Sequence, residues 1–399
     1  MAKTFRVVDL FAGCGGITAG FHRTGRFRTV GAVELDRAAA TTYTENFGAG
    51  IVHQRSIVGW SPTGEARKAD VVVGGPPCQG FSNLGAKRLD DPRNQLWREY
   101  VRVLTEIKPK VFVIENVDRF LKSDEFAALR AETLPGGELT DYSLDWDVVN
   151  AAEYGAAQIR RRTIVIGTRK DLEQIEIPGK TVKRREDWLT VAKALQGIQP
   201  GVHPENQLLP SGTVTHLEGP PIPGWFRSSD LHLTRNYQQL SLDRFRAIPA
   251  GGNRFDLPYE LKSPCWRKHT TGSGDVMGRL RWDQPSVTIR TEFFKPEKGR
   301  YLHPTENRAI THFEAARLQG FDDDFRWCGS KVEIARQIGN AVPVQLAEAI
   351  ARHLAAGLDG VAEPTGRLVR HPELFPLPPA DPRAPKFVRR SSRARAGVR

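Results

Sequence analysis

The first half of the chain alternates short apolar segments with amphipathic ones, and this alternation constrains the fold more than any other feature. Apolar or β-branched runs predict strands at residues 5–11, 28–33, 70–73, 111–114, 146–150 and 163–166. Helical spacing occupies residues 17–22, 37–46 and 95–107. Strands that alternate with helices at this interval predict an α/β fold with a mostly parallel, doubly wound sheet. Ligands of such sheets bind at the carboxyl ends of the strands.

The pattern changes after residue 170. Residues 171–300 are rich in proline and glycine and contain few periodic helices, which predicts a smaller, loop-rich domain. Helical periodicity returns at 314–318 and 344–354, so we expect residues 301–360 to complete the domain begun by residues 1–170. Residues 361–399 carry nine basic and three acidic side chains, a composition typical of a disordered tail.

Composition narrows the class of protein. No apolar run approaches the ~18 residues of a membrane span, and the amino end lacks an apolar signal stretch, so we expect a soluble cytoplasmic protein without a membrane partner. The four cysteines form no CxxC pair, which argues against a zinc ribbon or a disulfide framework. The net charge of +12 is localised: residues 151–300 hold 24 basic and 16 acidic side chains, and the tail adds six net positive charges. A local excess of this kind favours a polyanionic partner such as nucleic acid.

A glycine-rich turn follows the first predicted strand. Residues 9–16 read Asp-Leu-Phe-Ala-Gly-Cys-Gly-Gly and open a helix, and Glu34 ends the next strand 21 residues after Gly13. Glycines let a ligand approach the backbone and the helix amino end, and a carboxylate at this distance can accept hydrogen bonds from ribose hydroxyls. Because the full GxGxxG spacing is missing, the pattern favours a nucleoside cofactor without a pyrophosphate.

Cys78 is placed by two prolines in a glycine-bearing loop, Gly74-Gly75-Pro76-Pro77-Cys78-Gln79-Gly80, directly after a predicted strand. A structural cysteine is more often found within an apolar run. A helix amino end or nearby arginines would favour the thiolate, which is the attacking form. We therefore interpret Cys78 as a candidate nucleophile.

Two further groups end at the same predicted sheet edge. Glu115 terminates the 111–114 strand, and partial burial there would raise its pKa and let it hold a proton. Arg160, Arg161 and Arg162 precede the 163–166 strand, and alternation would place Arg160 and Arg162 on one face. Two aligned guanidiniums could bind a phosphate or a developing charge, although a triple arginine is more often a solvated edge.

Taken together and in this order, the motifs resemble those of the C5-cytosine DNA methyltransferases over most of residues 5–355. The glycine turn, Glu34 and the cysteine loop are followed by Glu115-Asn116-Val117 and by Gln158-Ile159-Arg160-Arg161-Arg162. Arg317-Leu318-Gln319-Gly320-Phe321 and Gln337-Ile338-Gly339-Asn340-Ala341-Val342-Pro343 complete the set. The family's loop-rich target-recognition domain corresponds to residues 171–300.

The resemblance implies a Rossmann-like domain, S-adenosylmethionine as cofactor and no metal. It makes Cys78 the nucleophile, Glu115 the acid that engages the base, and Arg162 with Arg160 the anchor of the pyrimidine or its phosphate. The positions implied to contact the cofactor are Phe11, Gly13, Gly15, Glu34, Ser56, Ile57, Pro77, Leu96 and Asn340. Ser56 is a departure, because the family usually has an acidic residue there that contacts the adenine; we expect weaker or differently arranged cofactor binding.

The chemistry requires these residue types. Cytosine C5 is a weak nucleophile, so a thiolate adds to C6 and makes C5 reactive, while a protonated carboxyl at N3 and an arginine stabilise the charge that develops. Since stacking shields C6 in a duplex, the cytosine must be flipped out at a cost of a few kcal/mol. Residues 79–91 are suited to a mobile loop that closes on DNA.

The partner implied is double-stranded DNA, contacted by Gln79, Ser82, Arg93, Trp266, Arg267 and Lys268, with Arg279, Arg281 and Arg290 as further candidates. We expect a monomeric bacterial enzyme associated with the nucleoid, in a restriction-modification or epigenetic system. A cognate restriction endonuclease could be encoded nearby. Three alternatives stay open: an RNA cytosine methyltransferase, a catalytically silent DNA-binding protein and an NAD-dependent dehydrogenase. The long recognition segment, the intact motif residues and the glycine spacing respectively disfavour them.

Overall fold

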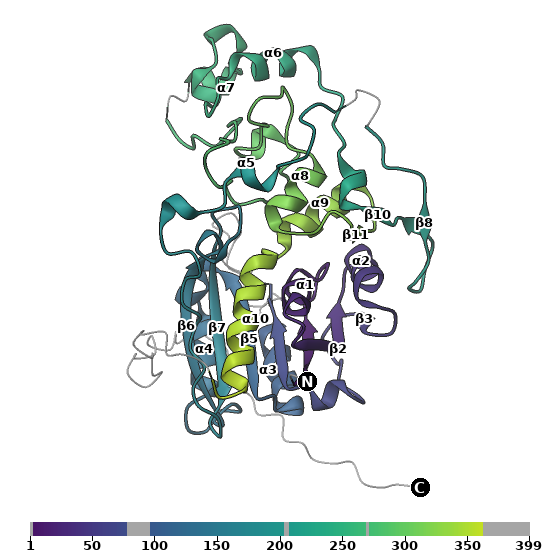
Figure 1. The fold of residues 1–399 in the computed structure, drawn as a ribbon, viewed down its shortest axis with the longest axis vertical. Helices are drawn as coiled ribbons and strands as arrows, with labels where there is room; N and C mark the ends of the chain where they lie inside the picture. The colour runs from purple at the N-terminus through teal and green to yellow at the C-terminus, as the bar shows by residue number, and fades with distance from the viewer. Residues whose placement is uncertain (1–2, 78–95, 203–206, 269–270, 362–399) are drawn as a thin grey trace.

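The computed structural model describes residues 3–77, 96–202, 207–268 and 271–361. Figure 1 shows two units, one above the other. The lower unit holds the large sheet and its flanking helices, and the upper unit is built from loops and short helices. Among the described residues, no helix is long and apolar enough to cross a membrane.

The lower unit is a seven-stranded sheet with the order β3-β2-β1-β4-β5-β7-β6. Its first five members pair in parallel, whereas β7 runs antiparallel to both β5 and β6. The prediction of a mostly parallel α/β sheet is therefore confirmed. The strands are β1 (Phe5–Leu10), β2 (Phe27–Glu34), β3 (Val52–Gln54), β4 (Val71–Gly74), β5 (Val111–Val117), β6 (Tyr142–Asn150) and β7 (Arg161–Arg169).

Helices cover both faces of this sheet because the strand side chains alternate between two apolar cores. Val7 and Val113 face the core formed with α1 (Gly16–Arg23) and α10 (Val344–Leu358). Their neighbours Val8 and Phe112 face the opposite core, formed with α3 (Leu96–Ile107) and α4 (Asp124–Glu132). This period of two follows from the strand pleat. Helix α2 (Arg37–Phe47) packs near the β3 edge, with Tyr43 against Ala32 and Val52.

The upper unit has little regular structure. Its apolar core includes Phe226, Phe293 and Trp327. Around this core lie α5 (Val191–Ala194), α6 (Gln239–Ala247), α7 (Pro264–Lys268), α8 (His312–Gln319) and α9 (Lys331–Asn340), with the short strands β8 (Thr213–Val214), β9 (Ile222–Pro223), β10 (Phe226–Arg227) and β11 (Arg326–Trp327).

The carboxyl-terminal segment is divided between the two units. Helices α8 and α9 contribute Leu318, Ile334 and Ile338 to the core that also contains Phe226, whereas α10 packs on the sheet with Leu346. Of the helices of this segment, sequence periodicity indicated α8 and α10 but missed α9. The signal for α9 is the capping box of Ser330 and Glu333 at its amino end.

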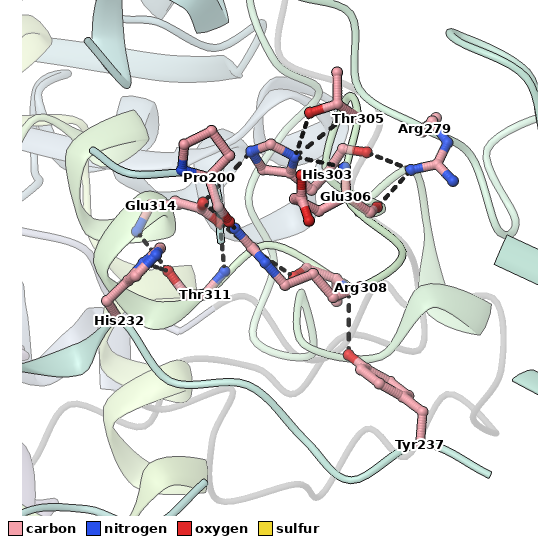
Figure 2. A network of polar contacts seen from close by, with 11 residues as sticks. Pro200, His232, Tyr237, Arg279, His303, Thr305, Glu306, Arg308, Thr311 and Glu314 are labelled. Carbon is pink, nitrogen blue, oxygen red and sulfur yellow. Dashed lines mark hydrogen bonds and ion pairs between the residues drawn. The ribbon is translucent and has the colours of Figure 1, made fainter. Parts of the chain in front are cut away.

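A buried polar network stabilises the upper unit (Figure 2). Glu314 accepts two hydrogen bonds from the Arg308 guanidinium, at 2.8 and 2.7 Å, and one from the backbone N–H of Thr311 at 2.7 Å. Its carboxylate also lies 3.6 Å from Nε2 of His303. Arg279 is 4% exposed and donates to carbonyl oxygens of four residues: Phe245, Ile248, His303 and Glu306.

The position of Arg279 corrects one prediction. We expected Arg279 among the candidates for reading DNA bases, but its guanidinium is buried and fully engaged with backbone carbonyls and with Asn307. Arg279 therefore stabilises the loops of the upper unit and does not read bases.

Candidate active site

A cleft of about 1020 Å³ opens at the carboxyl ends of β1, β2, β4 and β5. One wall comes from the sheet and includes Phe11, Glu34 and Glu115, and the other comes from residues 288–291 and from α9. Its position at the strand ends is the one expected for a ligand of a doubly wound sheet. Most of the predicted site residues that the structure describes line this cleft.

The glycine turn lines the cleft. Phe11, Gly13 and Gly15 all have positive φ, at 58, 56 and 90°. A side chain at position 15 could not be accommodated, because its Cβ would lie 2.2 Å from Cε2 of Phe47. The turn therefore brings the backbone to the start of α1, where free N–H groups can meet a ligand.

Glu34 is fixed beside this turn by two backbone donors. Its Oε2 accepts from the N–H of Gly13 at 2.8 Å, and its Oε1 accepts from the N–H of Asp36 at 2.7 Å. Burial raises the pKa of Glu34, although these hydrogen bonds oppose the shift. The carboxylate is thus held in one orientation at the cleft wall.

Behind the turn lies a second, fully buried carboxyl, that of Asp9. It accepts a hydrogen bond of 2.6 Å from the Thr18 hydroxyl, which also contacts the Tyr43 hydroxyl at 2.8 Å. Burial raises the pKa of Asp9 to about 7. Asp9 does not line the cleft, so we assign it a structural position below the glycine turn.

Other residues implied to contact the cofactor also lie at the cleft: Ser56, Ile57, Pro77, Leu96 and Asn340 line it with Phe11, Gly13 and Glu34. Gly15 is not among the lining residues. Leu35 was missed by sequence reasoning, yet it lines the cleft and is 67% exposed. The available signal was an apolar side chain placed just beyond the end of a strand.

Glu115 and Arg162, which both line the cleft, form an ion pair. Oε1 of Glu115 lies 2.8 Å from Nε of Arg162, and both side chains are largely buried. The pair forms because β5 and β7 are antiparallel neighbours, with Glu115 opposite Ile164 and Val117 opposite Arg162. Gly75 approaches Glu115 so closely that a Cβ there would lie 3.2 Å from Oε2.

The start of the cysteine loop is tied to the same strand. The Asn116 side chain donates to the carbonyl oxygen of Pro76 at 2.9 Å. Pro77, the last described residue before the gap, is exposed and lines the cleft. Cys78, Gln79, Ser82 and Arg93 lie outside the described residues.

Arg160 and Arg162 have different partners. Arg160 is 2% exposed, and its guanidinium donates to the carbonyl oxygens of Ile289 and Gly339 at 2.9 and 3.0 Å. Burial lowers the pKa of Arg160 to about 9. Arg160 therefore joins β7 to the far wall of the cleft, which favours a positioning role over direct contact with a base.

The predicted DNA contacts Trp266, Arg267 and Lys268 lie on α7, away from the cleft, at the top of Figure 1. Trp266 packs partly into the cluster around Phe245, with the Arg244 guanidinium 5.5 Å from its ring centroid. Arg267 and Lys268 are exposed, and Arg267 lies over the ring of Tyr259. Their contact with DNA stays a prediction.

The sheet and its cleft define the Rossmann-like fold of the S-adenosylmethionine-dependent methyltransferases. The chain belongs to the C-5 cytosine-specific DNA methylase family, whose family model matches residues 5–356. It is therefore an enzyme that methylates cytosine at C5 in DNA.

Individual relatives agree with this assignment. The chain is 35% identical to the Type II methyltransferase M1.HphI of Haemophilus parahaemolyticus, covering 86% of this chain and 85% of the relative. It is also 35% identical to the Type II methyltransferase M.XorII of Xanthomonas oryzae pv. oryzae, covering 88% and 84%. Among solved structures, a DNA modification methyltransferase encoded within an E. coli prophage shares 25% identity with a TM-score of 0.67, covering 89% of this chain and all of that one. The Dnmt2 methyltransferase of S. pombe shares the fold, with a TM-score of 0.56 over 89% of this chain and 99% of that chain at 16% identity.

Proposed function

We propose that this enzyme transfers a methyl group from S-adenosylmethionine to C5 of a cytosine flipped out of a specific duplex sequence, through a bond between Cys78 and C6. The observation that carries the proposal is the shared cleft. The glycine turn and Glu34 lie in the same cleft as the Glu115–Arg162 pair, so cofactor and base can meet there.

The cleft residues near the glycine turn fit S-adenosylmethionine. Glu34 offers a fixed carboxylate to the ribose hydroxyls, and the exposed Leu35 offers an apolar surface to the adenine. Ser56 can form a hydrogen bond with the base edge in place of a carboxylate. When bound, the cofactor supplies an electrophilic methyl group on a sulfonium.

The cleft residues around the Glu115–Arg162 pair fit a pyrimidine. Arg162 holds Oε1 of Glu115, which leaves Oε2 beside Gly75 to engage N3 of the cytosine. A proton at that oxygen would neutralise the charge that grows on the ring as the thiolate adds to C6. After methylation, loss of the C5 proton to water and expulsion of the Cys78 thiolate restore the aromatic ring and the free enzyme.

The biological setting belongs to the same proposal. Two relatives are named Type II methyltransferases, which supports a role in bacterial restriction-modification alongside a separately encoded endonuclease. We propose a cytoplasmic, nucleoid-associated monomer with double-stranded DNA as its substrate. The recognition domain, on this proposal, is residues 171–300.

Bisulfite sequencing of DNA from cells that express the chain tests the function. We expect one protected sequence context, and Cys78→Ser should reduce methylation at least about a thousandfold, since the nucleophile is lost. The variant should keep the circular dichroism spectrum and DNA binding of the wild type. Absence of methylated cytosine with the wild-type chain would refute the proposed function.

A further inference from the structure

The charged side chains that line the cleft are almost all paired. Glu115 pairs with Arg162 at 2.8 Å, Asp36 with Arg336 at 3.5 Å and Asp118 with Arg161 at 3.8 Å. Arg160 is satisfied by two carbonyl oxygens, as described above. Among the described residues, this leaves two lining guanidiniums with neither a carboxylate nor a carbonyl partner, those of Arg55 and Arg290.

These two arginines lie on different sides of the cleft. Arg55 directly follows β3 and its N–H donates to the carbonyl oxygen of Glu34, which places it on the cofactor side. Arg290 lies on the opposite wall, one residue after the carbonyl oxygen that Arg160 holds. Arg290 is exposed, and no hydrogen bond of its guanidinium is present among the described residues.

The backbone that carries Arg290 is held by contacts with three other residues, Ile159, Tyr301 and Gly339. The Thr288 hydroxyl donates to the carbonyl oxygen of Ile159 at 2.8 Å, and the Tyr301 hydroxyl donates to the carbonyl oxygen of Thr288 at 3.0 Å. Gly339 packs so closely that a Cβ there would lie 2.3 Å from the nitrogen of Thr291. A free cationic side chain is therefore presented from a backbone segment that is bonded to Ile159, just before the strand that carries Arg162.

We propose that the guanidinium of Arg290 binds a phosphodiester of the DNA strand that carries the target cytosine. The inference rests on the proposed function, because a nucleotide whose base reaches Glu115 must bring its own phosphates to the rim of the cleft. An arginine without a carboxylate partner attracts such an anion and can bind it through two N–H groups. Because the backbone of the segment is held before DNA binds, only the Arg290 side chain has to be ordered by the contact.

Three variants test the proposal on a duplex that carries the site mapped by bisulfite sequencing. Arg290→Gln removes the charge, and Arg290→Lys keeps it. Arg352→Gln is the matched control, because Arg352 is exposed on α10 outside the cleft lining and pairs with Glu348. DNA affinity is measured by fluorescence anisotropy at several salt concentrations, together with KM for DNA, KM for S-adenosylmethionine and Tm.

For Arg290→Gln we expect about tenfold weaker DNA binding and a salt slope that is smaller by about one. Arg290→Lys should recover most of the affinity, and KM for S-adenosylmethionine, Tm and the methylated sequence should not change. The control should match the wild type. Unchanged DNA affinity and salt slope in Arg290→Gln would overturn the inference. A change in the methylated sequence would also overturn it, because it would show that Arg290 contacts a base and not a phosphate. Neither result would affect the proposed function, which fails only if the wild type methylates no cytosine.

Discussion

The two units of the molecule are stabilised by different kinds of contact. In the lower unit, strand side chains alternate between two apolar cores, as Val7 and Val8 do. In the upper unit, buried arginines bind loop carbonyls, and the Arg308–Glu314 pair lies at the centre of a polar network (Figure 2). In a sheet, the strands satisfy one another's backbone hydrogen bonds, so few buried polar side chains are needed. Irregular loops leave backbone N–H and C=O groups unpaired, and side chains must form hydrogen bonds with them. The periodic pattern of apolar residues therefore specifies the fold of the lower unit, whereas individual buried polar side chains specify that of the upper unit.

The largest effect should come from removing one partner of the buried ion pair. Glu314→Ala leaves the Arg308 charge buried and unpaired, which costs about 3–5 kcal/mol of unfolding free energy. Glu292→Ala is the matched control in the same unit, because its pair with Lys295 is partly exposed and contributes less than about 1 kcal/mol. Chemical denaturation gives the free energies, and hydrogen exchange shows which unit opens.

A second variant keeps this test decisive if Glu314→Ala does not fold. Replacing both partners, as Arg308→Met with Glu314→Leu, removes the uncompensated charge and should cost less than Glu314→Ala alone. Equal loss of protection in both units in the single variant would contradict the comparison, since it would show one cooperative core.

The next largest effect is a difference between the two units in how their stability depends on pH. Burial lowers the pKa of His303 to about 4, from an ordinary value of 6.5, so its contribution to stability is present above pH 6.5 and is lost as pH falls toward 4. Asp9 has the opposite sign: its pKa is raised from 3.8 to about 7, so its contribution is present below pH 3.8 and is lost as pH rises through 7. At most, these shifts correspond to about 3 kcal/mol for His303 and about 4–5 kcal/mol for Asp9.

Hydrogen exchange between pH 4.5 and 7.5, corrected for intrinsic rates, can measure both effects in one sample. Acidification should weaken protection around His303 and strengthen it around the glycine turn. Asp9→Asn, which cannot titrate, should flatten only the dependence near the turn, and His303→Gln only that of the upper unit. Parallel pH profiles in the two units would show that these groups do not control local stability.

The same difference explains what could be predicted from the sequence. Six of the seven strands and most helices of the lower unit were predicted because period-two and period-3.6 patterns report burial directly, whereas the three-residue strand β3 was missed. The cleft position of Glu34 and Glu115 followed from strand ends, and the cofactor and base assignments followed from ordered motifs. The role of Arg279 could not be predicted, because its carbonyl partners at 245, 248, 303 and 306 are brought together only by loops. The isolation of Arg290 is likewise a property of three-dimensional pairing.

A smaller effect concerns only the lower unit. Leu35→Ala removes the exposed apolar surface beside Glu34, so we expect about tenfold weaker binding of S-adenosylmethionine, equivalent to about 1.4 kcal/mol. Calorimetry measures this affinity directly. Leu208→Ala is the control, because Leu208 is also exposed but lies outside the cleft. Loss of DNA affinity equal to the loss of cofactor affinity would show that the two binding regions are not separable.

The smallest effect should come from residues 362–399, which are not among the described residues. Deletion of residues 362–399 removes nine basic and three acidic side chains, six net positive charges, none of which belongs to the family motifs. We expect about threefold weaker DNA binding at low salt and a smaller salt slope, because the attraction is sequence-independent. The methylated sequence should stay the same, as bisulfite sequencing would show. A changed site preference would mean that recognition is not confined to the upper unit and that residues 362–399 also take part in it.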